Sequence, residues 1–228
     1  MLRKHFSHYL KMKIKTFEFN PLGVNTYVLY DETSECVIID AASIFPRENE
    51  ALINFIEENN LTVKRLINTH LHFDHLFGVN LMADKFGLKL EVHRDDLFLL
   101  DNLQDQLQMF GFNSDTNYKP EIGTFLTEDD IITFGNQEFK IIHIPGHSPG
   151  SLVFYNEREE VAIVGDVLFS GSIGRTDLLG GDFDLLIEGI KSKLLILPDK
   201  TSVYPGHGPS TTIGKEKKHN PFVGGSNY

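Results

Sequence analysis

The chain has 228 residues, which fits one large domain or two small ones with a substantial core. Its formal net charge is −11 and its dense basic run is limited to Lys215, Lys217 and Lys218, so nucleic acid is disfavoured as a partner. No run of about 18 apolar residues exists, so we expect no membrane span. The single cysteine, Cys36, excludes an intrachain disulfide and makes the cytoplasm the simplest compartment.

The first residues are basic, and their apolar side chains are too scattered for a signal peptide. We expect residues 1–11 to form a poorly ordered extension, with Met12 as an alternative start. Residues 12–228 contain no low-complexity linker, so we expect them to form a single domain.

Two segments about 125 residues apart resemble each other. Residues 27–42 and 152–167 each contain a β-rich run, a polar turn, a second apolar run and then an aspartate, Asp40 or Asp166. Runs rich in Val, Ile and Tyr around a polar turn predict β-hairpins. The repeated unit therefore predicts two related halves, with one sheet in each.

The remaining segments supply helices and further strands. The spacing of apolar residues predicts helices over 49–60, 76–86, 94–109 and 182–197, the last with Asp182 or Asp184 as its N-cap. Short apolar strands are expected over 63–69 and 201–208. Strands alternate with helices in both halves, so we expect an α/β protein in which helices cover two β-layers.

Three histidines and an aspartate fall within the stretch NTHLHFDHLFG, residues 68–78, after the predicted strand ends. Alternate residues of an extended backbone face the same way, so His70, His72 and Asp74 can converge while His75 points elsewhere. Imidazole nitrogens and carboxylate oxygens are ligands for zinc, iron or manganese. The pattern predicts two adjacent metal ions, although a polar loop with chance histidines is the alternative.

Three other strand ends carry ligand-type residues. His147, Asp166 and His207 each follow an apolar strand and each has a neighbouring glycine, which lets the backbone approach closely. Open α/β architectures build their sites beyond the carboxyl ends of strands. Four such strand ends make the chance explanation a poor one.

These residues resemble the metallo-β-lactamase-fold hydrolases. The resemblance rests on four motifs: Thr69 to His75, Gly146-His147, Gly165-Asp166 and Gly206-His207. The resemblance implies a four-layer αββα sandwich with the metals at one edge between the sheets. It also implies a first metal on His70, His72 and His147. It implies a second metal on Asp74, His75 and His207, with Asp166 bridging the two. Zinc β-lactamases usually have a cysteine ligand or lack the bridging aspartate. Cys36 occupies no ligand position here and Asp166 is present, so β-lactam hydrolysis is not expected.

Within this superfamily the chain most resembles the short bacterial type II glyoxalases, through residues 165–182 and 204–222. That resemblance implies hydrolysis of a thioester such as S-lactoylglutathione, a small acyl-thiol substrate. Two divalent ions, zinc first and iron or manganese as alternatives, would share a hydroxide that attacks the thioester carbonyl. Asp74 would ligate one metal and orient the hydroxide as a base.

Two further residues receive supporting roles. The longer glyoxalases have a lysine near Arg175 that contacts glutathione, so Arg175 is expected to meet a substrate carboxylate. A structural ion pair with Asp177 or Asp182 is the alternative. Asp40 is expected to hydrogen-bond a ligand histidine, and a turn cap is its alternative.

The chain departs from the longer glyoxalases after the last ligand histidine. Their tyrosine is missing near Pro209, and their C-terminal helical segment with basic glutathione contacts is absent. Lys215 and Lys217 are candidates to replace those contacts. The departures weaken the expectation of glutathione more than the expectation of hydrolysis.

Several alternatives stay open. Persulfide dioxygenases, with one iron on two histidines and an aspartate, also resemble the chain, and a dimetal site would also hydrolyse lactones. A nuclease and a binding protein on a decayed site are disfavoured, and the oligomeric state is open. Residues 99–125 are expected to include a loop over the site, with Phe110, Phe112 and Tyr118 as candidate pocket residues. His93 and His143 are expected to be ordinary strand-end or surface residues.

Overall fold

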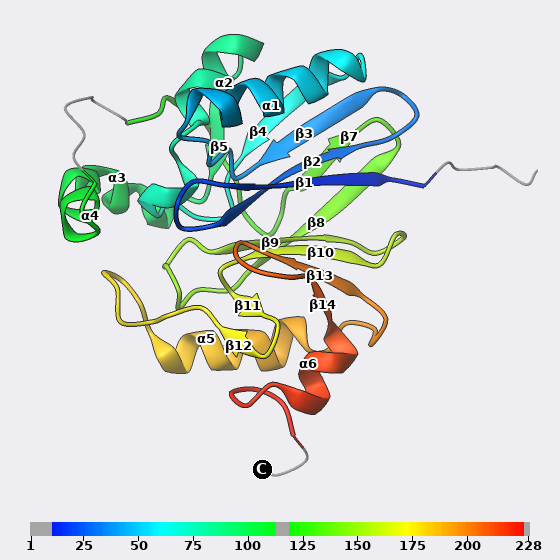
Figure 1. Ribbon diagram of the computed structural model, residues 1–228. Helices are drawn as coiled ribbons and strands as arrows, with labels where there is room; N and C mark the ends of the chain where they lie inside the picture. Colours follow the sequence, from blue (N-terminus) through cyan, green and yellow to red (C-terminus); the bar gives the residue numbers. More distant parts are fainter. Residues whose placement is uncertain (1–10, 113–118, 226–228) are drawn as a thin grey trace, which may run out of the picture.

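The computed structural model describes residues 11–112 and 119–225. Nearly all of the predicted N-terminal extension, residues 1–11, lies outside this part of the chain, and so does Tyr118. Two six-stranded sheets pack face to face, and helices cover the outer face of each (Figure 1). The predicted four-layer αββα sandwich is confirmed. No helix in the described residues is long and apolar enough to cross a bilayer.

The first sheet is formed by the N-terminal half. Its strands, in their order across the sheet, are β1 (Lys13–Phe19), β2 (Val24–Tyr30), β3 (Glu35–Ile39), β4 (Thr62–Ile67), β5 (Leu90–Val92) and β6 (Ile122–Phe125). Its helices are α1 (Pro46–Glu58), α2 (Val79–Phe86), α3 (Leu97–Asp101) and α4 (Leu103–Met109), with 3-10 turns at Phe73–His75 and Arg94–Asp96.

The second sheet is formed by the C-terminal half. Its order is β14 (Thr211–Thr212), β13 (Ser202–Pro205), β10 (Val161–Gly165), β9 (Leu152–Asn156), β8 (Gln137–His143) and β7 (Ile131–Phe134). The pair β11 (Leu168–Phe169) and β12 (Ser172–Ile173) forms a small separate ribbon, and α5 (Phe183–Gly189), a π turn (Ile190–Leu194) and α6 (Ile213–His219) cover the outer face.

The two predicted hairpins occupy matching places in the two sheets. Strand β2 pairs antiparallel with β3, and β9 pairs antiparallel with β10. Each hairpin then pairs in parallel with a later strand, β3 with β4 and β10 with β13. The expectation of two related halves is borne out by this topology, and it places Asp40 and Asp166 at equivalent strand ends.

Three apolar clusters hold the layers together. The central cluster lies between the sheets and includes Tyr27, Phe139 and Phe154, each at most 1% exposed. A second cluster packs the first sheet under α1 to α4, and a third packs the second sheet under α5 and α6. Burial of these apolar faces supplies the main driving force for the four-layer arrangement.

Hydrogen bonds also join the two sheets near the last ligand loop. The Asn25 side chain donates to the carbonyls of Pro205 and Gly208, and the Tyr27 hydroxyl donates to the Pro205 carbonyl at 2.6 Å. The backbone N–H of Asn25 donates to the Gly206 carbonyl at 2.7 Å. Strand β2 therefore positions the loop that carries His207.

Three predicted helices are shorter or more broken than expected. The segment 94–109 divides into a 3-10 turn, α3 and α4, and it is interrupted at Asn102, whose side chain also donates to the Phe98 carbonyl. The segment 182–197 begins as predicted, since the Asp182 carboxylate accepts from the Leu185 N–H at 3.0 Å. It then becomes a π turn, where Ser192 donates to the Glu188 carbonyl. The helix predicted over 76–86 begins only at Val79.

Candidate metal centre

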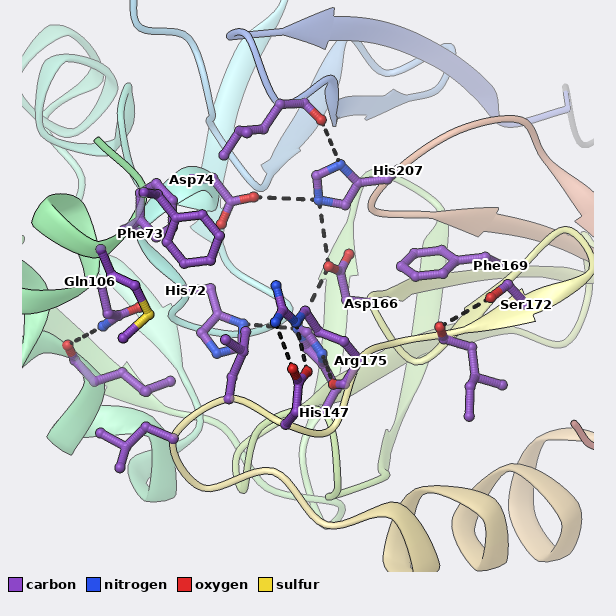
Figure 2. Close-up of a pocket in the computed structure, with 18 residues that line it drawn as sticks. His72, Phe73, Asp74, Gln106, His147, Asp166, Phe169, Ser172, Arg175 and His207 are labelled. Atoms are coloured by element: carbon purple, nitrogen blue, oxygen red, sulfur yellow. Dashed lines mark hydrogen bonds and ion pairs between the residues drawn. The ribbon is translucent and has the colours of Figure 1, made fainter. Parts of the chain in front are cut away.

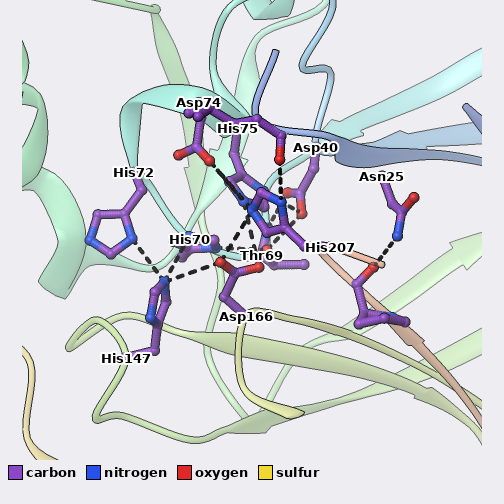
Figure 3. Close-up of polar contacts among 12 residues, drawn as sticks. Asn25, Asp40, Thr69, His70, His72, Asp74, His75, His147, Asp166 and His207 are labelled. Carbon is purple, nitrogen blue, oxygen red and sulfur yellow. Dashed lines mark hydrogen bonds and ion pairs between the residues drawn. The ribbon is translucent and has the colours of Figure 1, made fainter. Parts of the chain in front are cut away.

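The predicted ligands converge at one edge of the sandwich, between the two sheets (Figure 3). Four of them follow β4 directly, and the others follow β8, β10 and β13. Six of the seven side chains belong to buried residues, and His207 is partly exposed. The seven are His70, His72, Asp74, His75, His147, Asp166 and His207. All of the residues predicted from the strand ends are therefore brought together.

Three histidines form the first cluster. The Nδ1 atom of His72 lies 2.8 Å from Nε2 of His147. The same Nε2 atom lies 3.2 Å from Nε2 of His70. Three imidazole nitrogens facing one point are a ligand set that zinc and iron accept.

The second cluster lies beside the first. Nε2 of His207 is 3.4 Å from Oδ2 of Asp74, and Nε2 of His75 is 3.9 Å from the same oxygen. Asp166 lies between the clusters, because its Oδ2 is 3.6 Å from Nε2 of His147 and 3.5 Å from Nε2 of His207. Its Oδ1 is 3.6 Å from Nε2 of His75. One carboxylate thus reaches both clusters.

The far ring nitrogens are held by hydrogen bonds that turn the near nitrogens inward. Nδ1 of His147 donates to the Arg175 carbonyl at 2.8 Å, and Nδ1 of His207 donates to the Leu22 carbonyl at 3.0 Å. Since a carbonyl only accepts, each Nε2 keeps its lone pair for a metal. Among the described residues, the buried atoms His75 Nε2 and Asp166 Oδ1 have no hydrogen-bond partner. The residues present therefore fit two divalent cations.

The electrostatics differ between the two clusters. Burial, together with the neighbouring histidines, lowers the pKa of His72 to about 3 and that of His147 to about 4, so these rings are neutral ligands at pH 7. Burial alone would lower the pKa of His75, but Asp74, Asp166 and Asp40 together raise it to about 10. The carboxylates of the second cluster therefore attract positive charge, which a divalent cation would supply in place of protons.

Asp40 makes the predicted contact with a ligand histidine. Its Oδ2 accepts from Nδ1 of His75 at 3.1 Å. It also accepts from the Thr69 hydroxyl at 2.7 Å and, through Oδ1, from the Thr69 N–H at 2.7 Å. That hydroxyl lies 3.0 Å from Nδ1 of His70. One carboxylate therefore orients a histidine of each cluster.

Replacement of Asp40 by asparagine is expected to weaken metal binding by about 10- to 100-fold. An amide keeps one acceptor oxygen and turns N–H groups toward Thr69 or His75, both of which already donate. Competition with a chromogenic chelator would measure the loss. The matched control is Asp31→Asn, which alters a buried carboxylate that accepts from Thr33 and Asn136 far from the site. Equal losses in both variants would contradict the role of Asp40.

Arg175 lines the pocket beside the first cluster, but its guanidinium is already paired. Its Nε donates to Oδ1 of Asp177 at 2.8 Å, and Nη2 donates to Oδ2 at 2.7 Å (Figure 2). Asp182 instead caps α5. Of the two interpretations of Arg175, the ion pair with Asp177 is present in the structure, and the substrate contact stays a prediction.

Sequence reasoning missed Asp96, a buried carboxylate that ties two ligand loops together. Its Oδ2 accepts from the Leu71 N–H at 3.1 Å and the Ser148 hydroxyl at 2.8 Å. Its Oδ1 accepts from the Gly150 N–H at 2.6 Å. Burial raises the pKa of Asp96 to about 6. In the sequence the residue follows Asp95 in a predicted helix start, where an aspartate is an ordinary capping residue, so no signal marked it.

The two predicted pocket phenylalanines that the structure describes lie in different places. Phe110 lines the pocket, whereas Phe112 packs on Phe73 and Phe77 beneath it. The rings of His93 and His143 stack with centroids 4.3 Å apart. Their nitrogens bond the Asp95 N–H and the Pro149 carbonyl. Together with Asp95 they also form a group that could hold a metal ion, so their ordinary structural role stays a prediction.

The chain is similar to known proteins in sequence and in fold. The family model described as the metallo-beta-lactamase superfamily matches residues 19–207. The chain is 38% identical over 213 residues to the hydroxyacylglutathione hydrolase GloC of Haemophilus influenzae, covering 93% of this chain and 98% of that one.

Two solved structures are similar over nearly their whole length. One is titled BLEG-1 B3 metallo-beta-lactamase, with 39% identity, a TM-score of 0.82, and coverage of 93% of this chain and 100% of that chain. The other is TTHA1623 in a di-iron-bound form, with 34% identity, a TM-score of 0.80, and coverage of 92% and 100%. The fold, the ligand geometry and these similarities agree, and the chain belongs to the metallo-beta-lactamase superfamily.

Proposed function

We propose that the protein is a dinuclear metal-dependent hydrolase that cleaves a small acyl-thiol thioester. The observation that carries the proposal is the position of Asp166, whose carboxylate lies within 3.6 Å of ligand nitrogens in both clusters. The similarity to a hydroxyacylglutathione hydrolase supports a thioester, and S-lactoylglutathione is the test substrate.

When bound, two divalent cations would lower the pKa of water from about 15.7 toward about 7 and so supply a hydroxide nucleophile near neutral pH. They would also supply positive charge for the oxyanion and the leaving thiolate. The G-x-S-x-G pattern occurs once, at residues 146–150, but a strand follows it where a nucleophile elbow would have a helix. Its serine, Ser148, is buried and donates its hydroxyl to Asp96. The single cysteine, Cys36, lies buried in β3, and burial raises the pKa of its thiol to about 12. A protein-derived serine or cysteine nucleophile is therefore disfavoured.

The carboxylates of the second cluster would orient water and carry its proton. Asp74 is almost buried, and both it and Asp166 line the pocket (Figure 2). Zinc is the first expectation for the metal, with iron or manganese as alternatives, since the donors suit all three. A thiol-carried substrate and a buried free cysteine also suit a reducing compartment, so we place the protein in the cytoplasm.

The test is hydrolysis of S-lactoylglutathione by purified protein, with metal content measured on the same sample. We expect about two metals per chain, and we expect His72→Ala to lower turnover by more than about 100-fold because it removes a ligand nitrogen from the first cluster. His219→Ala, which alters an exposed histidine at the end of α6, is the matched control.

The same samples separate the competing reactions. Oxygen uptake with glutathione persulfide, in protein holding about one iron per chain and inactive on thioesters, would replace the proposal by a persulfide dioxygenase. Nitrocefin turnover tests β-lactam hydrolysis, for which the similarity to BLEG-1 is the argument and the lack of a cysteine ligand is the counterargument. Turnover of a lactone series tests the remaining hydrolytic alternative.

A further inference from the structure

The pocket above the metal centre has an apolar wall contributed by both halves of the chain (Figure 2). Its volume is about 470 Å³, within the range of small-molecule pockets. Nine of the side chains that line it are apolar: Leu22, Phe73, Leu99, Met109, Phe110, Phe169, Ile173, Leu178 and Leu179. The polar groups of the pocket belong mainly to the metal centre at its floor.

Some of these apolar side chains are open to solvent. Leu22, Met109, Phe110 and Leu179 are between 36% and 74% exposed. Exposed apolar side chains that gather around one opening mark a surface that binds an apolar group. Packing of the central core does not require these four side chains, because none of them belongs to its buried clusters.

The charges around the pocket do not suit an anionic carrier. Among the described residues that line the pocket, the one arginine or lysine is Arg175. Its charge is already neutralised by Asp177, to which it donates two hydrogen bonds of 2.7 and 2.8 Å. The candidate replacements for glutathione contacts, Lys215 and Lys217, do not line the pocket. Lys215 donates to Ser170, and Lys217 donates to Asp199 and to a backbone carbonyl. The two carboxylates of glutathione would meet no unpaired cation in the described part of this wall.

We infer that the natural substrate carries an apolar acyl chain on a thiol of little charge, and that the wall formed by Met109 and Phe110 binds the chain. This inference rests on the proposed thioester hydrolysis. The acyl chain would lie against the apolar wall while its carbonyl faces the two metal clusters. Glutathione would then contribute little to recognition.

The test uses full-length zinc-loaded protein and uncleavable S-alkyl thioethers of N-acetylcysteamine, with affinity measured by calorimetry. Each buried methylene should tighten binding roughly fourfold, so S-hexyl should bind about 50-fold more tightly than S-propyl. The affinities of S-hexylglutathione and S-hexyl-N-acetylcysteamine should differ by less than about threefold.

Two variants probe the wall and one serves as control. Met109→Ser and Phe110→Ser should each reduce the gain in affinity per methylene to less than about twofold. Ile196→Ser removes an apolar side chain that is 72% exposed, close to the 74% of Met109, but that does not line the pocket, and it should leave the gain unchanged.

A glutathione thioether that binds more than tenfold more tightly, or an affinity independent of chain length, would overturn the inference. Hydrolysis of the corresponding thioesters is measured separately on the same protein. If binding follows chain length but no thioester is cleaved, the proposed reaction fails while the ligand class stands, so the two failures are distinguishable.

Discussion

Asp166→Asn is expected to lower the metal content from about two ions per chain to about one and to reduce hydrolysis by more than about 100-fold. The carboxylate is the group that reaches nitrogens of both clusters, so an amide in its place leaves the clusters without a shared anionic ligand. Metal analysis and turnover of S-lactoylglutathione measure the two effects.

The stability of the metal-free protein should respond differently to this substitution. Burial raises the pKa of Asp166, and its Oδ1 has no hydrogen-bond partner, so the group gives the apo fold little support. We expect the unfolding free energy of apo Asp166→Asn to lie within about 1 kcal/mol of the wild type. A loss of activity accompanied by a large loss of apo stability would instead mark Asp166 as a packing residue.

Asp96→Ala, in contrast, is expected to lower the stability of the fold. Removal of its carboxylate leaves the buried N–H groups of Leu71 and Gly150 without an acceptor, while Ser148 keeps an alternative partner in Ser151. Each orphaned buried donor costs about 1–3 kcal/mol, so we expect about 3 kcal/mol of lost stability in urea unfolding. Metal affinity should also fall, since Leu71 and Ser148 adjoin ligand histidines.

Two further variants make this prediction specific. Asp96→Asn retains one acceptor oxygen, so its loss of stability should be about half that of the alanine variant. Asp95→Ala changes the adjacent carboxylate, whose side chain is 56% exposed, and should cost less than about 0.5 kcal/mol. If Asp96→Ala binds metal as tightly as the wild type while unfolding earlier, then Asp96 supports the fold and does not position the ligands.

The parts of the site that could be predicted are those that local patterns encode. His70, His72 and Asp74 follow an apolar strand, and Asp166 and His207 follow others, so strand periodicity alone placed them at one edge. Asp40 was found because its hairpin repeats the hairpin before Asp166. The first signal is local to each strand end, and the second comes from comparing two hairpins about 125 residues apart, each with its own local pattern.

What could not be predicted depends on particular side-chain contacts, one of them between distant segments. Asp96 reaches Ser148 across 52 positions, and nothing near Asp96 reveals that partner. The helix predicted over 94–109 is interrupted at Asn102, whose side chain also donates to the Phe98 carbonyl, and periodicity does not detect such a bond. The pairing of Arg175 with Asp177 was one of two open interpretations, because sequence spacing allows a pair without requiring it.

Each metal cluster takes ligands from both halves of the chain. His70 and His72 meet His147, about 75 positions away, and Asp74 meets His207, about 130 positions away. Contacts of such sequence separation form slowly, because a long loop must close before they gain any energy. Neither half holds a complete ligand set by itself. Binding of the two proposed metal ions would therefore require the two sheets to be docked, and during synthesis the site could be completed only after the strand before His207 had emerged.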